Sequence, residues 1–217
     1  IYTPTELEQK DENRESRIGV AVELDQVSFQ HLGASRRTID SVSLTAAAGN
    51  FIAIVGPSGA GKTTLVDLIL GLYSPNAGTV TLDGVEPEKL RETSPGLLSY
   101  VPQKPGLVAG SIAHNVALGL RPTDWDEDAI WAALEGAQLA DHVRGLDDTI
   151  HSTLGSHSDA LSGGQIQRLG LARALYTKPH LIILDEATSA LDAATEASIA
   201  AAIRNLGRET TVIVIAH

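Results

Sequence analysis

Hydrophobic and polar residues follow two different periods along the chain, which predicts a protein that combines strands with helices. Residues 20–29 and 41–46 alternate with a period of two, the spacing of a strand with one buried face. Residues 77–84 and 97–103 predict two further strands between turn residues. Three shorter runs are almost entirely aliphatic: FIAIV (51–55), LIILD (181–185) and TTVIVIA (210–216). Such runs are typical of parallel strands that are buried on both faces, so we expect a parallel sheet.

Helical spacing occurs in two parts of the chain. Lys62 opens KTTLVDLILGLY, in which apolar residues recur every three or four positions. The long segment 111–178 is also predicted to be mainly helical. Within it, Asp124 is the expected N-cap of a helix, and Glu127 stands at the capping-box position. The expected apolar face of that helix comprises Ile130, Leu134 and Ala137.

The two ends of the chain suggest a linker before the domain and a longer protein. Residues 1–17 are polar and mixed in charge, which is typical of a solvated linker. The chain starts at Ile1, has no methionine and stops at His217, directly after a strand of buried type. We therefore expect a longer protein in which residues 18–217 form one domain that continues past His217.

Composition narrows the classes of partner. The net charge is −11, whereas a protein that binds duplex nucleic acid usually presents a basic face, so nucleic acid is not an expected partner. A polyphosphate ligand stays open, because it needs only a local positive site. The chain has no cysteine, which excludes disulfides and thiolate metal sites, and its seven histidines show no metal-ligand spacing. No apolar run approaches the ~18 residues of a membrane-spanning helix.

The segment GPSGAGKT at 56–63 is the most specific chemical motif, because it fits the pattern G-x-x-x-x-G-K-[ST] of a phosphate-binding loop. It lies between a predicted strand and a predicted helix. Its glycines allow backbone N–H groups to face an anion at the helix N-terminus. Lys62 is expected to contact the β- and γ-phosphates of a nucleotide, and the Thr63 hydroxyl to ligate Mg²⁺. The expected nucleotide-binding residues are Gly56, Pro57, Ser58, Gly59, Ala60, Gly61, Lys62, Thr63 and Thr64.

A pair of carboxylates ends the aliphatic run at 181–185. Asp185 is expected at the carboxyl end of a buried strand, where ligands bind in open α/β sheets, and to hold Mg²⁺ through water. Glu186 would then polarise the water that attacks the γ-phosphate. An Asp-Glu pair alone is more typical of a solvated helix start. Together with the phosphate loop, the pair favours a catalytic role.

A third motif, LSGGQ at 161–165, completes a set that resembles the nucleotide-binding domain of ABC transporters, and the resemblance extends from about Val20 to His217. It implies an α/β fold: a P-loop NTPase core with a mostly parallel sheet, an N-terminal antiparallel β-subdomain and an inserted α-helical subdomain at about 108–178. It also implies that the domain hydrolyses ATP with Mg²⁺ at the cytoplasmic face of a membrane. Its expected partners are a second nucleotide-binding domain and the transmembrane domains of a transporter.

In that family the LSGGQ segment closes over the γ-phosphate that a second subunit holds. Here it stands at the start of a predicted helix, where free N–H groups and the helix dipole attract an anion and Ser162 can act as the cap. Without the resemblance, a plain loop with an N-cap would be the better interpretation. The residues expected to meet the partner's nucleotide are Ser162, Gly163, Gly164 and Gln165.

Four further residues acquire a role only through the resemblance. Gln103 matches the glutamine that contacts Mg²⁺ and the attacking water. Asp192, in SALD, matches the acid of a loop that crosses the dimer interface, and His217 matches the histidine that contacts the γ-phosphate. His31 stands where the family has an aromatic ring that stacks on adenine, and an imidazole offers less stacking area.

Two segments, 71–84 and 105–119, resemble exporters, and in an exporter the linker at 1–17 would follow the last membrane helix. One feature weakens this assignment, because exporters often carry a Gly-Glu pair before LSGGQ and this chain has Gly155 followed by Ser156.

Three alternatives compete with an exporter. A soluble ABC ATPase without membrane partners stays open. A P-loop kinase or GTPase is disfavoured by LSGGQ and by the lack of an N-K-x-D motif. A regulatory module without turnover is disfavoured by the intact Lys62, Asp185 and Glu186.

Overall fold

The computed structural model of the chain describes residues 19–154, 161–186, 193–204, 206 and 209–216. The strands are β1 (Val22–Phe29), β2 (Ile39–Ala46), β3 (Phe51–Val55), β4 (Ala77–Leu82), β5 (Leu98–Val101), β6 (Gly110–Ser111), β7 (Thr153–Leu154), β8 (Leu181–Asp185) and β9 (Thr211–Ala216). The helices are α2 (Lys62–Ile69), α3 (Pro87–Thr93), α4 (Ile112–Val116), α5 (Glu127–Gly136), α6 (Ala140–Arg144), α7 (Gly163–Tyr176) and α8 (Ala193–Arg204), with two 3₁₀ turns, η2 (Pro122–Asp124) and η3 (Thr149–His151). This arrangement confirms the predicted α/β fold class.

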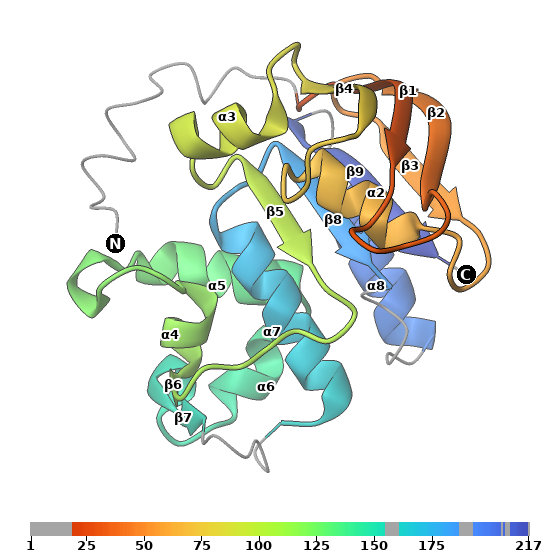
Figure 1. The fold of residues 1–217 in the computed structure, drawn as a ribbon. Helices are drawn as coiled ribbons and strands as arrows, with labels where there is room; N and C mark the ends of the chain where they lie inside the picture. Colours follow the sequence, from red (N-terminus) through yellow and green to blue (C-terminus); the bar gives the residue numbers. More distant parts are fainter. Residues whose placement is uncertain (1–18, 155–160, 187–192, 205, 207–208, 217) are drawn as a thin grey trace.

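A parallel sheet in the order β3-β9-β8-β5 forms the centre of the fold (Figure 1). The strands β8 and β9 are covered on both faces, because alternate residues enter two different hydrophobic cores. Ile183 and Ile213 pack on the side of α2, while Ile182 and Val212 pack on the side of α7. Both strands are therefore aliphatic without a polar face, as predicted for parallel strands in the middle of a sheet.

The prediction that 51–55 is a fully buried strand is wrong. Within the described part of the chain, β3 pairs only with β9 and lies at the edge of the sheet. Ile52 and Ile54 pack against the core beside α2, but the other face is partly open, so Phe51 is 51% exposed and Val55 is 66% exposed. A run of apolar residues shows that a strand is hydrophobic but not where it stands in the sheet.

An antiparallel sheet in the order β2-β1-β4 lies beside α2 and confirms the predicted N-terminal antiparallel β-subdomain (Figure 1). Leu24 and Leu82 share a core with Leu68 and Ile69 of α2. The helix α2 is shorter than its apolar pattern, because Gly71 takes a φ of +67° and ends the helical turn. A Cβ on Gly71 would lie 2.7 Å from the backbone nitrogen of Glu88, so the turn also requires glycine for space.

The helices α4 to α7 pack on the opposite side of the parallel sheet (Figure 1). The apolar face predicted for α5 is confirmed, since its three residues are buried: Ile130, Leu134 and Ala137. The predicted N-cap is wrong. Asp126 caps the helix by accepting a 3.0 Å hydrogen bond from the backbone of Ala129, whereas Asp124 ends η2 and pairs with Arg121 at 2.7 Å. Glu127 is consequently the first residue of α5, not its capping-box partner.

The sequence-based prediction does not include α3, α8 or the short ladder between β6 and β7. The helix α3 begins with Pro87 at its first position, which is a recognised start signal for a helix. The short ladder between β6 and β7 pairs Gly110 with Leu154, so the segment 111–178 is not helical throughout. Among the residues described, no helix is both long and apolar enough to cross a membrane.

Candidate nucleotide site

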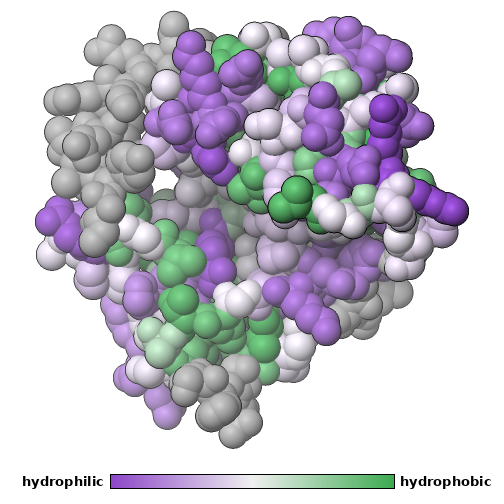
Figure 2. Space-filling model, in the orientation of Figure 1, coloured by the Kyte–Doolittle hydropathy of each residue, from purple (hydrophilic) through white to green (hydrophobic). Residues whose placement is uncertain are grey.

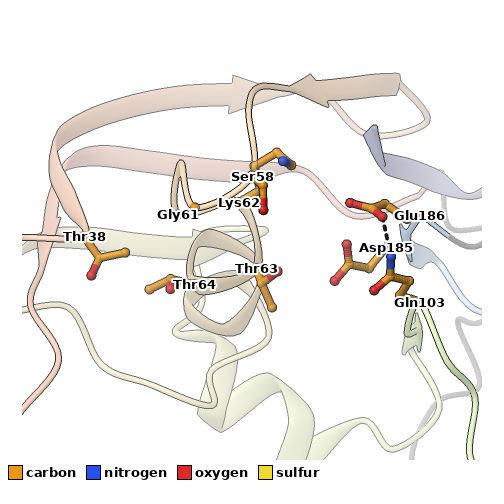
Figure 3. Close-up of a pocket in the computed structure, with 10 residues that line it drawn as sticks. Thr38, Ser58, Gly61, Lys62, Thr63, Thr64, Gln103, Asp185 and Glu186 are labelled. Carbon is orange, nitrogen blue, oxygen red and sulfur yellow. Dashed lines mark hydrogen bonds between the residues drawn. The ribbon is translucent and has the colours of Figure 1, made fainter. Parts of the chain in front are cut away.

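A cavity of about 400 Å³ lies between the N-terminus of α2 and the carboxyl end of β8 (Figure 3). Its lining residues come from four separate stretches of the chain: Thr38, Ser58, Gly59, Gly61, Lys62, Thr63, Thr64, Gln103, Asp185 and Glu186. All of these except Thr38 were candidate site residues on the sequence. Folding therefore brings the phosphate loop, the glutamine after β5 and the carboxylates after β8 to one cavity.

The backbone of the phosphate loop depends on glycine at two positions. Gly59 has a φ of +78° and Gly61, the N-cap of α2, has a φ of +88°. A Cβ on Gly61 would lie 2.9 Å from the carbonyl oxygen of Thr38, whereas a Cβ on Gly59 would meet nothing within 4 Å. Thr38 belongs to none of the sequence motifs, because it approaches the loop only through the tertiary fold. The first turn of α2 contains no acidic residue, so the helix itself places no carboxylate against an anion at its N-terminus.

Lys62 lies folded over its own loop. Its ammonium group donates hydrogen bonds of 2.7 Å to the carbonyl oxygen of Gly56 and 3.1 Å to that of Pro57. The positive charge is thus held beside the backbone N–H groups of the loop. Together these donors provide the local positive site that a polyphosphate needs in a protein with a net charge of −11.

Asp185 is a buried carboxylate, 7% exposed, at the carboxyl end of β8. The hydroxyl of Tyr100 donates a 3.1 Å hydrogen bond to its Oδ2. Burial and the Asp185 carboxylate raise the pKa of Tyr100 well above its usual range, so the phenol stays a donor. Burial and the same carboxylate also raise the pKa of Asp67. The negative field around Asp185 therefore favours a cation.

The oxygen donors near this field suit Mg²⁺. Thr63 offers a hydroxyl, Gln103 an amide oxygen and Asp185 a carboxylate, and all three line the cavity. Hard oxygen donors of this kind, with room for water, are what Mg²⁺ prefers. The residues therefore fit the metal, although no cluster of three His, Cys, Asp or Glu side chains that could hold a metal occurs in the described residues.

Glu186 adopts an uncommon backbone conformation next to Asp185. Its φ is +49°, a left-handed geometry that costs a non-glycine residue about 1–2 kcal/mol. Its backbone N–H donates to the carbonyl oxygen of Ile215 at 3.2 Å. Its carboxylate accepts a 2.6 Å hydrogen bond from the side-chain amide of Gln103, which is the dashed line in Figure 3. Strain of this kind concentrates at functional sites, where surrounding contacts hold it.

His31 lies outside the lining of the cavity, in a small aromatic cluster. Its ring is edge-on to Phe29 at 4.9 Å and to Tyr73 at 5.6 Å, and its Nε2 is 3.2 Å from the hydroxyl of Thr64. Phe29 is 8% exposed, as expected for a core residue of β1. The contact with Thr64 connects His31 to α2, and stacking on adenine stays a prediction.

The LSGGQ segment is not part of this cavity. Ser162 is the N-cap of α7, and a capping box joins it to Gln165. Ser162 and Gly163 are exposed, and a Cβ on Gly163 would meet nothing within 4 Å. The first turn of α7 also lacks acidic residues, so the positive end of its helix dipole faces outward without an opposing carboxylate in that turn. Two other candidate residues, Asp192 and His217, lie outside the described residues.

One face of α7 binds the segment that carries Gln103. Gln167 donates a 3.2 Å hydrogen bond to the carbonyl oxygen of Gln103, and Gly170 lies so close to Pro105 that a Cβ would stand 2.5 Å from the proline ring. Arg173 donates to the carbonyl oxygen of Gly106 at 3.0 Å. The helix that begins with LSGGQ is thus connected to the partner of Glu186.

Residues 39–189 match the protein family described as ABC transporter. The chain belongs to the ABC transporter family. Membership of this family implies that the chain binds ATP. The resemblance stated from the phosphate loop, LSGGQ and LIILDE is thereby confirmed.

Several ABC transporters are similar to almost the whole chain. An ATP-dependent lipid A-core flippase of Burkholderia thailandensis is 43% identical over 206 residues, which cover 93% of this chain and 34% of the flippase. ABC multidrug transporter E of Aspergillus fumigatus is 39% identical over 203 residues, 92% of this chain and 16% of the transporter. The chain therefore spans about a third or less of these relatives.

A solved structure confirms the relationship at the level of the fold. The structure of a bacterial Atm1-family ABC exporter with ATP bound superposes with a TM-score of 0.81 at 35% identity, over 92% of this chain and 35% of the exporter chain. The chain is therefore an exporter-like ABC nucleotide-binding domain in fold and sequence.

Proposed function

We propose that this chain binds and hydrolyses ATP to power transport by an ABC exporter. The observation that carries the proposal is the cavity itself, in which the phosphate loop, the buried Asp185 and the hydrogen-bonded Gln103 and Glu186 line one space. The alternative of a soluble ABC ATPase is not favoured, because the similar proteins are named as flippases, transporters and exporters.

The proposed nucleotide contacts follow from the cavity and its neighbours. The backbone N–H groups of residues 58–64 and the ammonium of Lys62 receive the phosphates. His31 lies beside α2 at the place proposed for the base. Thr63, Gln103 and Asp185 would hold Mg²⁺, which would neutralise negative charge on the phosphates. Tyr100 orients the Asp185 carboxylate by hydrogen bonding.

Glu186 is the proposed group that polarises the attacking water. Its side chain lines the cavity, and the 2.6 Å hydrogen bond from Gln103 orients the carboxylate there. A positioned acid–base group of this kind contributes about 10²–10⁴-fold to the rate. His217 is proposed to contact the γ-phosphate.

The LSGGQ segment is proposed to act on a second nucleotide-binding domain. It lies outside the cavity of its own chain, and its exposed helix N-terminus suits an anion delivered from another molecule. Ser162, Gly163, Gly164 and Gln165 then face the partner's nucleotide, and Asp192 lies at the same interface. Binding of ATP would join the two domains, and hydrolysis would release them.

The transmembrane domains of the transporter are the other proposed partners, which would place the chain at the cytoplasmic face of a membrane. On the face of the protein that Figure 2 shows, apolar side chains gather over the region of β6 and α4. Leu118, two residues after the end of α4, is 44% exposed. Exposed apolar side chains that gather on one surface suit a protein interface.

The proposal is tested by phosphate release and by equilibrium binding of MgATP to the full chain. We expect hydrolysis that requires Mg²⁺ and that rises more steeply than linearly with protein concentration, because two chains must meet. Binding without any hydrolysis, at concentrations that permit dimers and with Glu186 intact, would contradict the proposed turnover.

A further inference from the structure

The side chain of Gln165 is committed to the cap of its own helix. Its Oε1 accepts a 2.6 Å hydrogen bond from the backbone N–H of Ser162, and its backbone N–H donates to the Ser162 hydroxyl at 3.3 Å. This capping box sets the orientation of the Ser162 side chain. Because Oε1 faces Ser162, the amide nitrogen Nε2 must point away from it.

The amide nitrogen meets a histidine from another helix. Nε2 of Gln165 lies 3.2 Å from Nδ1 of His142, on α6. An amide NH₂ only donates, so Nδ1 must accept, and the ring proton then resides on the other nitrogen of His142. That nitrogen is buried and has no hydrogen-bond partner within the described residues. Within the part of the chain that the structure describes, the polar contact of this ring is therefore with Gln165 of the LSGGQ segment.

The helix that carries His142 is firmly held. Val143 is completely buried and Ala140 is 4% exposed, so α6 is packed into the helical core. A second link runs in parallel, since Arg168 of α7 donates a 2.7 Å hydrogen bond to the carbonyl oxygen of Gln138 in the turn before α6. Hydrogen bonds from Gln165 and Arg168 thus connect the N-terminal half of α7 to α6 and to the turn before it.

We propose that His142 is a positioning residue for the nucleotide of the partner domain. It holds the amide of Gln165, Gln165 holds Ser162, and Ser162 with the N–H groups behind it receives the γ-phosphate. The inference rests on the proposed function, because it assigns a purpose to the LSGGQ surface only if that surface closes on a second nucleotide. His142 itself does not touch the nucleotide.

Three substitutions separate this role from simple packing. In His142→Asn, the Oδ1 atom takes nearly the place of Nδ1 and can accept from Gln165. In His142→Phe, the ring is kept and the acceptor is lost. His151→Phe is the matched control, because His151 lies on η3 with a side chain that is 58% exposed.

The measurements are made on the full chain with Glu186→Gln as background. We record MgATP binding at low protein concentration, the ATP-dependent dimer dissociation constant and the unfolding temperature. His142→Phe is expected to weaken the dimer about two- to tenfold, the effect of one hydrogen bond, and to leave nucleotide affinity and unfolding temperature unchanged. His142→Asn should restore the dimer, and the His151 variant should resemble the parent.

Equal dimer affinity for the Asn and Phe variants would overturn the proposal, as would a loss that follows the unfolding temperature. Failure of the proposed function has a different signature. If ATP produces no dimer with unmodified His142, and Ser162→Arg changes nothing, then the LSGGQ surface does not receive a nucleotide and both proposals fall. If ATP produces a dimer that Ser162→Arg abolishes, the function stands and the two His142 variants decide the inference alone.

Discussion

The side-chain amide of Gln103 donates a 2.6 Å hydrogen bond to the carboxylate of Glu186. The two residues follow neighbouring parallel strands, since Val101 of β5 is in register with Leu184 of β8. Parallel strands end at the same edge of a sheet, which is how residues 83 positions apart come into contact. Gln167 of α7 binds the backbone of Gln103, so the helix that begins with LSGGQ supports the orientation of Glu186.

This contact predicts coupled effects on turnover. Gln103→Ala should lower kcat about 10- to 100-fold, the usual loss when a residue that orients a functional group is removed. In a Glu186→Gln background the same substitution should add little, because the group that it orients is already lost. Single-turnover phosphate release from the parent, the two single variants and the double variant measures the coupling. Fully additive losses would show that Gln103 and Glu186 act independently.

Lys62→Ala should weaken MgATP binding about 10- to 100-fold, because hydrogen bonds from a charged donor are lost while the backbone donors of the loop remain. Lys89→Ala removes an exposed lysine on α3 and serves as the control for the change in net charge. Equilibrium binding with a fluorescent ATP analogue gives both affinities. Equal affinities of the two variants would contradict the assignment of Lys62.

The parts of this site that were predictable are those with local causes. The glycines at 59 and 61 take positive φ angles that few other residues adopt, and the Gly-Lys-Thr that follows is needed at a phosphate. The strands β8 and β9 are aliphatic because both faces are covered, and this burial leaves a readable pattern.

Contacts between distant residues were not predictable. Tyr100 and Asp185 are 85 positions apart, and neither Tyr100 nor His142 belongs to a motif. The edge position of β3 depends on the order of strands in the sheet, and a run of apolar residues does not indicate that order. At α5, Asp124 and Asp126 both suit an N-cap, and the choice is made by the pairing of Asp124 with Arg121.

Gly61→Ala should destabilise the fold more than Gly59→Ala. Both positions have φ near +80°, so alanine costs each about 1–2 kcal/mol of backbone strain. Only at Gly61 does the new Cβ also approach the carbonyl oxygen of Thr38, at 2.9 Å, and Ile39, at 3.0 Å. Urea unfolding of the two variants compares them directly. An equal loss at both positions would show that β2 moves away without cost.

His31→Tyr should tighten ATP binding modestly, because a phenol ring offers more stacking area and aromatic pairs contribute about 0.5–1.5 kcal/mol beyond burial. His31→Ala should weaken it. The hydrogen bond between His31 and Thr64 is lost in both variants, so their difference isolates stacking. Affinities measured for ATP and for inorganic triphosphate separate the base from the phosphates. If both variants bind ATP like the parent, the ring does not contact adenine.

The central claim is that LSGGQ closes on the nucleotide of a second domain. The molar mass of the Glu186→Gln variant in solution with saturating MgATP tests this claim most directly. Light scattering after size-exclusion chromatography at moderate salt, which screens the −11 charges, should give a dimer. The same protein with Ser162→Arg should stay monomeric, because a bulky side chain on the exposed cap blocks close approach. A monomer that hydrolyses ATP at the parental rate would contradict both the closure and the role of Glu186.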